Sequence, residues 1–206
     1  MAQNYAWNNS PGTATSLGGY AVQVLAGGGP TQGSNAARFE LRDGDIPSFG
    51  GGERTELSNS APGATVNDGD EVWIEQSIKF DSTFACPTDW FLVQQWRSGP
   101  NSPAAALNVN SSCGLTLGNN VSGVNLPIGS IGKGAWHKYV IHAKFTQSAG
   151  TGWVEVWQDG VKKVQRTGMQ LLDASTGYLK QGIYRSAALS GTAIVSHSGL
   201  RIYKVG

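Results

Sequence analysis

Residues 153–165 read WVEVWQ, then DG, then VKKVQ. Side chains in both runs alternate with period two, as expected for β-strands that bury one face. Asp159-Gly160 between them suits a two-residue type I′ turn, because Asn, Asp and Gly tolerate the positive φ that this turn requires. The segment therefore predicts a β-hairpin.

The same period-two pattern recurs along the chain in short segments separated by Gly, Asn, Asp, Ser and Pro. The expected strands are Tyr20–Ala26, Ala37–Arg42, Glu53–Ser58, Glu71–Phe80, Trp90–Trp96, Ala104–Val109, His137–Thr146, Trp153–Gln158, Val161–Gln165, Tyr178–Arg185 and Leu200–Val205. No convincing helix is visible. These strands predict an all-β fold, a two-sheet antiparallel β-sandwich of the jelly-roll, concanavalin-like type. With no repeat and no long linker, we expect one domain over residues 1–206.

Composition excludes several classes of protein. The 206 residues include 15 Lys and Arg and 14 Asp and Glu, a formal net charge of +1, so there is no electrostatic argument for a nucleic-acid or membrane partner. No apolar run approaches the roughly 20 residues that span a bilayer. With 39% hydrophobic residues and seven Trp, the chain is too apolar for a disordered protein.

Cys86 and Cys113 lie almost symmetrically about the turn residues 98–103. Facing residues of an antiparallel hairpin have a nearly constant sum of positions, so the two cysteines could face each other. A disulfide is geometrically plausible and would favour an oxidising compartment; two buried thiols are the alternative. Residues 1–7 lack the basic and apolar regions of a signal peptide, so either a leader was removed or the protein leaves its cell by another route, such as a virus particle.

Polar residues gather on single faces of three expected strands. Arg54, Glu56 and Ser58 share one face of their strand, and Tyr178, Lys180, Gly182 and Tyr184 share one face of theirs. Residues 93–97 place two amides and Arg97 at the end of an apolar run. One such face would suit an exposed surface with ion pairs such as Glu56 with Lys180. Three of them favour a polar groove.

These segments resemble the motifs of polysaccharide lyases. Arg54-Thr55-Glu56-Leu57 resembles the Arg-Ser/Thr-Glu-Leu/Val motif of jelly-roll alginate lyases, and residues 178–184 resemble their Tyr-Phe-Lys-Ala-Gly-Val-Tyr. The wider layout is more similar to the heparin lyase I and glucuronan lyase group. The segments that carry this likeness, over residues 36–205, are Arg38-Phe39-Glu40, Glu71-Val72-Trp73, Gln95-Trp96, Ala135-Trp136-His137, residues 155–160 and Gly182-Ile183-Tyr184-Arg185.

The resemblance implies a polysaccharide lyase that cleaves a uronic-acid polymer by β-elimination. Tyr184 would take the place of the catalytic tyrosine, with Arg54 and Gln95 as the other catalytic residues. Glu56 and Lys180 would bind substrate. Apart from the resemblance, the polar strand positions of Arg97 and His142 make them further candidates for substrate binding. A base removes the C5 proton and the 4-O-glycosidic bond breaks, leaving a C4–C5 unsaturated sugar. Arginine and amide donors must stabilise the enediolate charge.

One position departs from the lyase pattern. Alginate and heparin lyases usually have His two residues after the glutamine, and here that position holds Arg97. On glucuronate or β-mannuronate, the C5 proton and the C4 oxygen leave from the same side, so one tyrosine can serve as base and acid. The departure fits this syn elimination, and it also fits a lyase fold that has lost activity.

The remaining candidates are histidines and acidic turns. His137 is expected to be structural, and His142 shares a polar strand face with Lys138 and Lys144, so it could reach the groove. His197, in a Ser-rich stretch, is expected in an exposed loop. No cofactor is expected to be required, although Asp43-Gly44-Asp45 and Asp68-Gly69-Asp70 could hold a structural calcium.

The leading hypothesis is a secreted, extracellular and monomeric lyase whose partner is an acidic, glucuronate-containing polysaccharide, with no nucleic acid and no membrane involved. The alternative is a non-catalytic carbohydrate-binding or adhesive jelly-roll domain, such as a virion component.

Overall fold

The computed structural model describes residues 8–9, 19–47, 51–59, 63–101 and 103–206. This part of the chain forms strands and no helix, which confirms the all-β prediction, and it contains no helix able to cross a membrane. The strands are β1 Asn8–Asn9, β2 Val22–Leu25, β3 Ala36–Leu41, β4 Glu53–Asn59, β5 Thr65–Asn67, β6 Glu71–Phe80, β7 Phe91–Arg97, β8 Ala105–Val109, β9 Gly114–Asn119, β10 Val124–Ser130, β11 Trp136–Lys144, β12 Trp153–Gln158, β13 Val161–Thr167, β14 Thr176–Arg185 and β15 Ala193–Lys204.

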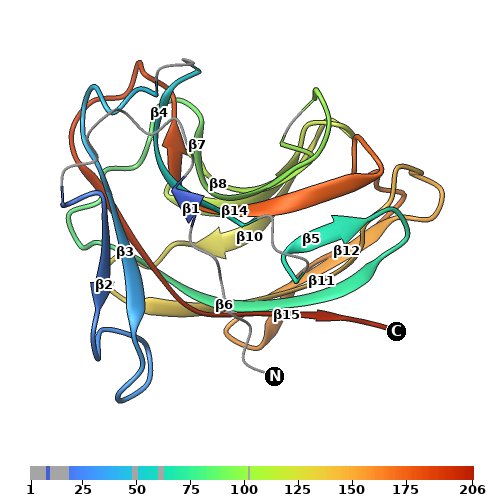
Figure 1. Cartoon of the computed structure of the whole chain (residues 1–206), viewed down its shortest axis with the longest axis horizontal. Coiled ribbons are helices and arrows are strands. Elements are labelled where there is room, and N and C mark those ends of the chain that lie inside the picture. The colour runs from blue at the N-terminus through green and yellow to red at the C-terminus, as the bar shows by residue number, and fades with distance from the viewer. Residues whose placement is uncertain (1–7, 10–18, 48–50, 60–62, 102) are drawn as a thin grey trace.

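The strands form two antiparallel sheets that pack face to face, as in a jelly roll (Figure 1). The groove sheet has the order β1-β4-β14-β7-β8-β9-β10, with β5 beside β14. The second, outer sheet has the order β13-β12-β11-β6-β15-β3-β2. In Figure 1, β7, β8 and β14 curve upward, so the groove sheet is concave on the side that faces away from the outer sheet. All the strands belong to one sandwich, and the single domain over residues 1–206 stays a prediction.

The core lies between the sheets, where alternate residues of each strand meet. Ile74 and Ile78 of β6 and Leu107 and Leu117 of the groove sheet are all buried. A chain of amides crosses this apolar layer: Gln181 Nε2 donates to Gln76 Oε1 at 2.7 Å, and Gln76 donates in turn to Gln94. Amide pairs inside a core link the two sheets at one register, because a shifted partner would leave buried polar atoms unsatisfied.

The expected strands agree with β2, β3, β4, β6, β7, β8, β11, β12, β13, β14 and the end of β15. The sequence pattern did not predict β1, β5, β9, β10 and the first half of β15. Pro127 and Gly129 disfavour a strand over 124–130, but β10 lies at an edge of the groove sheet, where proline is tolerated. Ser196, His197 and Ser198 read as a polar loop, yet all three are buried in β15.

Cys86 and Cys113 form a disulfide, with their Cα atoms 5.0 Å apart. The bond connects the segment before β7 to the turn between β8 and β9. The symmetric placement of the two residues about the β7–β8 connection therefore indicated a real pairing, and the alternative of two thiols is wrong.

Replacing both cysteines, Cys86→Ser with Cys113→Ser, is expected to lower the free energy of unfolding by about 3 kcal/mol, because the bridge closes a loop across 27 positions of sequence. Urea denaturation of both proteins measures this difference. A reductant should produce the same loss in the natural chain and none in the double variant. Equal midpoints for the two proteins would show that the bond adds no stability.

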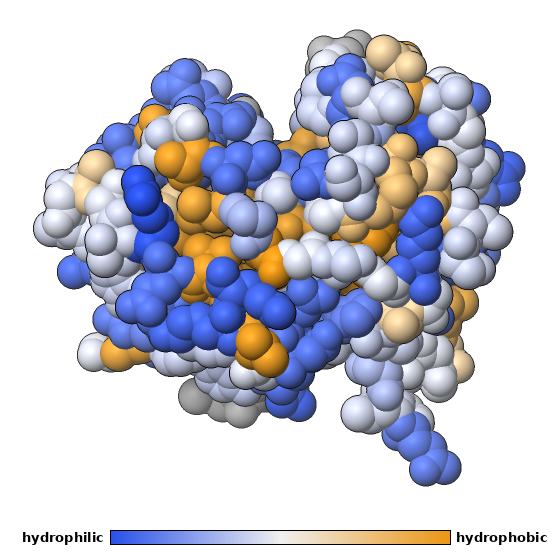
Figure 2. Space-filling view, turned by 180° about the vertical axis from the view of Figure 1, so that it is seen from behind, coloured by the Kyte–Doolittle hydropathy of each residue, from blue (hydrophilic) through white to orange (hydrophobic). Residues whose placement is uncertain are grey.

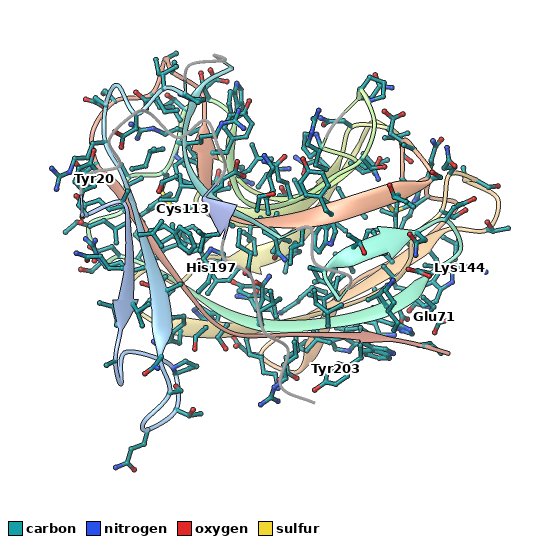
Figure 3. All side chains as sticks on the ribbon, in the orientation of Figure 1. Tyr20, Glu71, Cys113, Lys144, His197 and Tyr203 are labelled. Carbon is teal, nitrogen blue, oxygen red and sulfur yellow. A yellow bond between two sulfur atoms is a disulfide. The ribbon has the colours of Figure 1, made fainter. Side chains whose placement is uncertain are left out.

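His197 lies between the sheets (Figure 3), so the prediction of an exposed loop is wrong. Its ring meets the edge of Phe39 at a centroid distance of 5.4 Å. Neither ring nitrogen has a hydrogen-bond partner within the described residues. Burial therefore lowers the pKa of His197 to about 3.

This pKa predicts a loss of stability in mild acid. Between pH 6.5 and 3 the unfolded chain binds a proton at His197 and the folded chain does not, so the free energy of unfolding falls as pH falls. Between pH 6.5 and 4.5 the loss from this group is about 2 kcal/mol. Urea denaturation at pH 6.5 and 4.5 should show a smaller fall for His197→Leu than for the natural chain. Equal falls would contradict the assignment.

Candidate active site

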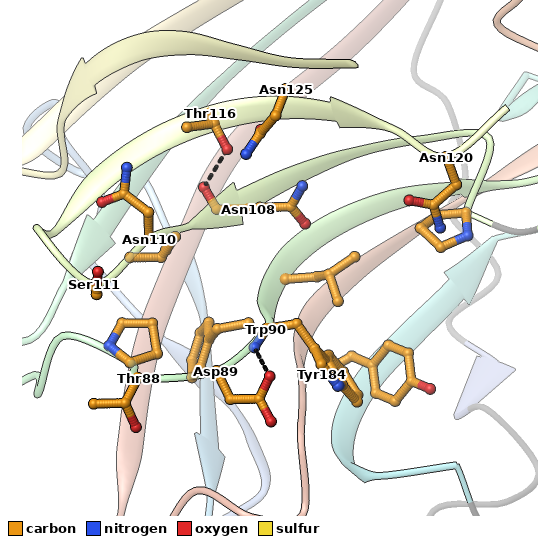
Figure 4. A pocket seen from close by; sticks show the side chains of 15 residues that line it. Thr88, Asp89, Trp90, Asn108, Asn110, Ser111, Thr116, Asn120, Asn125 and Tyr184 are labelled. Carbon is orange, nitrogen blue, oxygen red and sulfur yellow. Dashed lines mark hydrogen bonds between the residues drawn. The ribbon is translucent and has the colours of Figure 1, made fainter. Parts of the chain in front are cut away.

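The concave face of the groove sheet holds a hollow of about 570 Å³, open to solvent between two raised walls (Figures 2 and 4). Its lining combines apolar, amide and hydroxyl side chains of β7 to β10 and of the segment before β7 with Tyr184 of β14. The polar groove expected from strand faces is therefore present. Beside the hollow, on β4, β14 and β7, lies the charged floor, which we define as Arg54, Glu56, Gln95 and Lys180.

Antiparallel pairing explains why these residues meet. On neighbouring strands Tyr184 lies opposite Arg54, and Lys180 lies opposite Gln95. Glu56 is two residues beyond Arg54 and so points to the same side of the sheet. The face that we predicted from alternation is confirmed, because all these side chains project away from the core.

Tyr184 is half-buried in a cationic and aromatic setting. The guanidinium carbon of Arg54 lies 3.9 Å from the centre of the Tyr184 ring, and Trp90 meets the same ring edge-on at 4.6 Å. The hydroxyl of Tyr184 donates a hydrogen bond to the carbonyl of Gly51. The ring is thus held by three neighbours, and its hydroxyl is directed to the segment just before β4.

Glu56 lies at the centre of the charged floor. Gln95 Nε2 donates to Glu56 Oε1 at 2.6 Å. The other carboxylate oxygen, Oε2, lies 3.6 Å from Arg54 Nη1 and 3.8 Å from Lys180 Nζ. The four residues are each at most 7% exposed. A single carboxylate therefore orients an amide and partly balances two cations.

Burial changes the acidity of this cluster. Burial raises the pKa of Glu56, against the opposing effects of the Lys180 ammonium and the Gln95 amide. Arg54 opposes the shift more weakly. Burial also lowers the pKa of Lys180, and although Glu56 opposes this, the charges of Arg54 and Arg97 add to it. The charge state of the floor thus depends on Glu56 remaining close to both cations.

Of the residues expected to bind substrate, His142 is placed elsewhere. It lies on β11 of the outer sheet, where its Nε2 is 2.8 Å from Glu71 Oε1 and its ring stacks on Trp73 at 3.7 Å. Figure 3 labels Glu71 on that sheet. The prediction is wrong because a polar strand face can equally be the solvent face of the opposite sheet. Arg97 does reach the groove side, opposite Tyr178, and is exposed.

No histidine stands in the groove among the residues that the structure describes, which include all three in the sequence. His137 Nδ1 lies 2.6 Å from Asp159 Oδ2 beside the β12–β13 turn, in agreement with a structural role. His142 lies on the outer sheet, and His197 is buried between the sheets. The Arg97 position is therefore not compensated by a histidine from another strand.

The acidic turns serve the backbone. Asp45 Oδ2 accepts a hydrogen bond from the Arg42 amide, and Asp68 Oδ1 accepts one from the Gln147 amide, both at 2.8 Å. Within the described ranges, no group of three or more His, Cys, Asp or Glu side chains could hold a metal ion. Structural calcium stays a prediction.

One wall of the groove is not apparent in the sequence. The strand spacing of Trp90 is typical of a core tryptophan, yet this residue is 41% exposed and lies against Tyr184. The asparagines Asn108, Asn120 and Asn125 also line the hollow (Figure 4). Asn108 lies in a run that reads as a buried strand, and the other two belong to segments that read as turns, so only the pairing of β8, β9 and β10 reveals them.

The fold is that of a jelly-roll protein with an open groove on its curved sheet. The chain belongs to the polysaccharide lyase family, whose family model, described as "Polysaccharide lyase", matches residues 30–201. The protein is thus a polysaccharide lyase, and the family resemblance inferred from the motifs is confirmed. No curated protein matches the chain by sequence comparison.

Solved structures share this fold. The endo-β-1,4-glucuronan lyase of the fungus Trichoderma reesei has a TM-score of 0.73 at 12% identity, over 96% of this chain and 90% of that one. The alginate lyase of Corynebacterium sp. has a TM-score of 0.67 at 13% identity, over 93% and 84%. An alginate lyase of polysaccharide lyase family 7 has a TM-score of 0.62 at 16% identity, over 97% and 89%. At these identities the likeness shows the fold.

Glu56→Gln is expected to lower the free energy of unfolding by about 3 kcal/mol at pH 7, because the buried cations lose their counter-charge while Gln95 keeps an acceptor. Without Glu56, the pKa of Lys180 falls further below its unfolded value of 10.5. As pH rises toward 10.5, the unfolded variant therefore binds more protons than the folded variant, and its free energy of unfolding increases with pH. The difference in free energy of unfolding between the variant and the natural chain, which we call the deficit, then becomes smaller.

Urea denaturation at pH 7 and pH 9.5 measures this deficit. The matched control is Glu155→Gln on the outer sheet, where the partners are the half-exposed Lys162 and, at 3.5 Å, His142, and it should change stability by less than about 1 kcal/mol. A Glu56→Gln deficit that stays constant between the two pH values would show that Lys180 does not respond to Glu56.

Proposed function

We propose that the protein cleaves a uronic-acid-containing polysaccharide by β-elimination, with Tyr184 as base and acid. The observation that carries this proposal is the packing of Tyr184 against Arg54 beside a buried, cation-rich floor at the edge of an open groove. The family membership and the neighbours named as glucuronan and alginate lyases support a uronate polymer as substrate.

In the proposed reaction, the phenolate of Tyr184 takes the C5 proton of the uronate. The electrons of the C5–H bond form the C4–C5 double bond, and the bond between C4 and the glycosidic oxygen breaks. The leaving oxygen then takes the proton from Tyr184, which restores the phenolate. Protons and electrons balance, and no further co-reactant is required.

The charged floor would make the C5 proton removable. A C5 proton next to a carboxylate is weakly acidic, since its removal places a second negative charge on the same group. Arg54 and Lys180 supply positive charge, and Gln95 supplies an amide donor whose orientation is set by Glu56. Fixed charges and donors of this kind stabilise an enediolate because they need no rearrangement during the reaction.

The groove favours syn elimination. Trp90 and Arg54 flank Tyr184, and no histidine of the described chain stands opposite it as a second proton carrier. One residue acting as both base and acid suits sugars whose C5 proton and C4 oxygen leave from the same side, as in glucuronate and β-mannuronate. We therefore propose a glucuronate-containing polymer as the substrate class.

The cellular setting is proposed on the same grounds. A disulfide is stable in an oxidising compartment, and polymers of this kind are found outside cells, so we propose a secreted enzyme that works as a monomer. We propose that catalysis requires no cofactor, with calcium limited to a structural role.

Ultraviolet absorbance of unsaturated uronate tests the proposal directly. The natural chain should produce it from at least one uronate polymer, and Tyr184→Phe should abolish turnover while the melting temperature and polymer binding are largely kept. Arg54→Ala should lower kcat strongly, while the melting temperature should change little. The outer-sheet variant Glu155→Gln is the matched control and should keep full turnover.

Full turnover by Tyr184→Phe would overturn the assignment of the base. Absence of product from every polymer, with retained affinity for one of them, would instead favour the non-catalytic carbohydrate-binding domain.

A further inference from the structure

Charge is distributed unevenly across the groove. Arg54, Lys180 and Arg97 stand on β4, β14 and β7. Among the fifteen residues that line the hollow within the described chain, none is Lys, Arg or His, and the single carboxylate is Asp89. Residues 1–18, 48–50, 60–62 and 102 contain no charged side chain, so the undescribed residues do not alter this distribution.

The uncharged part, which we call the amide half, is formed by β8, β9 and β10. Its polar side chains are Asn108, Thr116, Asn120 and Asn125 (Figure 4). The hollow takes lining residues from β14, β7, β8, β9 and β10, which are successive neighbours in the groove sheet, so it runs across the strands. A polymer in the groove therefore passes from the charged floor into the amide half.

The amide half converges on a glycine. Asn108 of β8 and Asn125 of β10 flank Gly118 of β9, which lies opposite both Ala106 and Asn125 in the ladder. A Cβ atom at position 118 would lie 2.1 Å from Asn108 Nδ2 and 3.7 Å from Asn125 Oδ1. A bare backbone here lets an amide donor and an amide acceptor come together over the sheet.

Such a surface matches hydroxyl and acetamido groups, which both donate and accept hydrogen bonds as amides do. A carboxylate only accepts, so it could use the amide nitrogens alone and would leave the amide oxygens without a donor. Hydrogen bonds from the Ser186 side chain and the Trp90 amide lower the pKa of Asp89, which is ionised at neutral pH and would repel a carboxylate.

Resting on the proposed function, we propose that the amide half is a subsite for an uncharged sugar, so the preferred substrate is a polysaccharide in which uronate alternates with neutral sugar residues. The charged floor takes the uronate that loses its C5 proton, and the amide half takes its neutral neighbour. A homopolymer of uronate would place a carboxylate in both positions.

The test compares initial rates of unsaturated-uronate formation on two sets of polymers. The alternating set is hyaluronan, unsulfated chondroitin and heparosan, and the homopolymer set is glucuronan and polymannuronate. At least one alternating polymer should be cleaved with a kcat/KM about tenfold above that of either homopolymer. Equal or faster cleavage of a homopolymer would overturn the subsite and leave the lyase proposal intact. Absence of product from all five would overturn both.

Asn125→Lys places a cation in the amide half at an exposed position. It should raise kcat/KM on the homopolymers several-fold and lower it on the alternating polymer. Gln165→Lys on β13 makes the same change in net charge on the outer sheet and should alter neither value. Parallel rises on both sets of polymers in both variants would show general attraction of polyanions, which contradicts a local subsite.

Gly118→Ala probes the converging amides without a change of charge. The new methyl group would meet the end of the flexible Asn108 side chain, which can turn aside, so the fold should be kept. KM for the alternating polymer should rise several-fold while kcat and the melting temperature change little. An unchanged KM would show that Asn108 does not contact the sugar.

Discussion

The site depends on the close approach of β14 to β4 at Gly182. Its φ is +134°, and a Cβ atom there would lie 2.2 Å from the Thr55 carbonyl oxygen and 2.8 Å from the Glu56 Cα, so only glycine fits. The pairing of β14 with β7 shifts register beside this residue, between Gln181 and Tyr184. The ladder between β14 and β4 stays regular across the same residues, and it places Tyr184 opposite Arg54 on the groove side. A residue with a side chain at position 182 would push β4 and β14 apart and so separate the tyrosine from Arg54 of β4.

The charged floor brings together side chains of both signs. Arg54 and Lys180 are basic and Glu56 is acidic, and all three are at most 7% exposed. Under the proposed function, the carboxylate of a uronate would add a second negative group beside the two basic side chains. Glu56 has a double role, since it keeps the cations close enough to act together and also holds the Gln95 amide in place.

Much of this architecture could be predicted from the sequence, because alternation assigns Arg54, Glu56, Lys180 and Tyr184 to shared faces before any pairing is known. The same rule failed for His142, since a polar face does not reveal which sheet carries it. It failed for His197 as well, because a buried histidine with no polar partner within the described residues looks like a loop residue in a Ser-rich stretch. The amide half could not be predicted from the sequence for a different reason. Its asparagines come from β8, from the turn between β9 and β10, and from β10, and only the pairing of these strands brings them to one place.

The two halves of the groove also differ in what holds them. The charged floor stands on β4, β14 and β7, which lie inside the groove sheet and are fixed by ladders on both sides. The amide half ends at β10, an edge strand containing Pro127, and its far wall is the segment before β7. The Cys86–Cys113 bridge connects that segment to the β8–β9 turn, adjoining Pro87 and Thr88 on one side and Ser111 on the other. The covalent bond thus supports the far wall, which lies outside the strands. Under the two proposals, the chemistry takes place over β4, β14 and β7, and the neighbouring sugar lies against a wall that the disulfide ties to the β8–β9 turn.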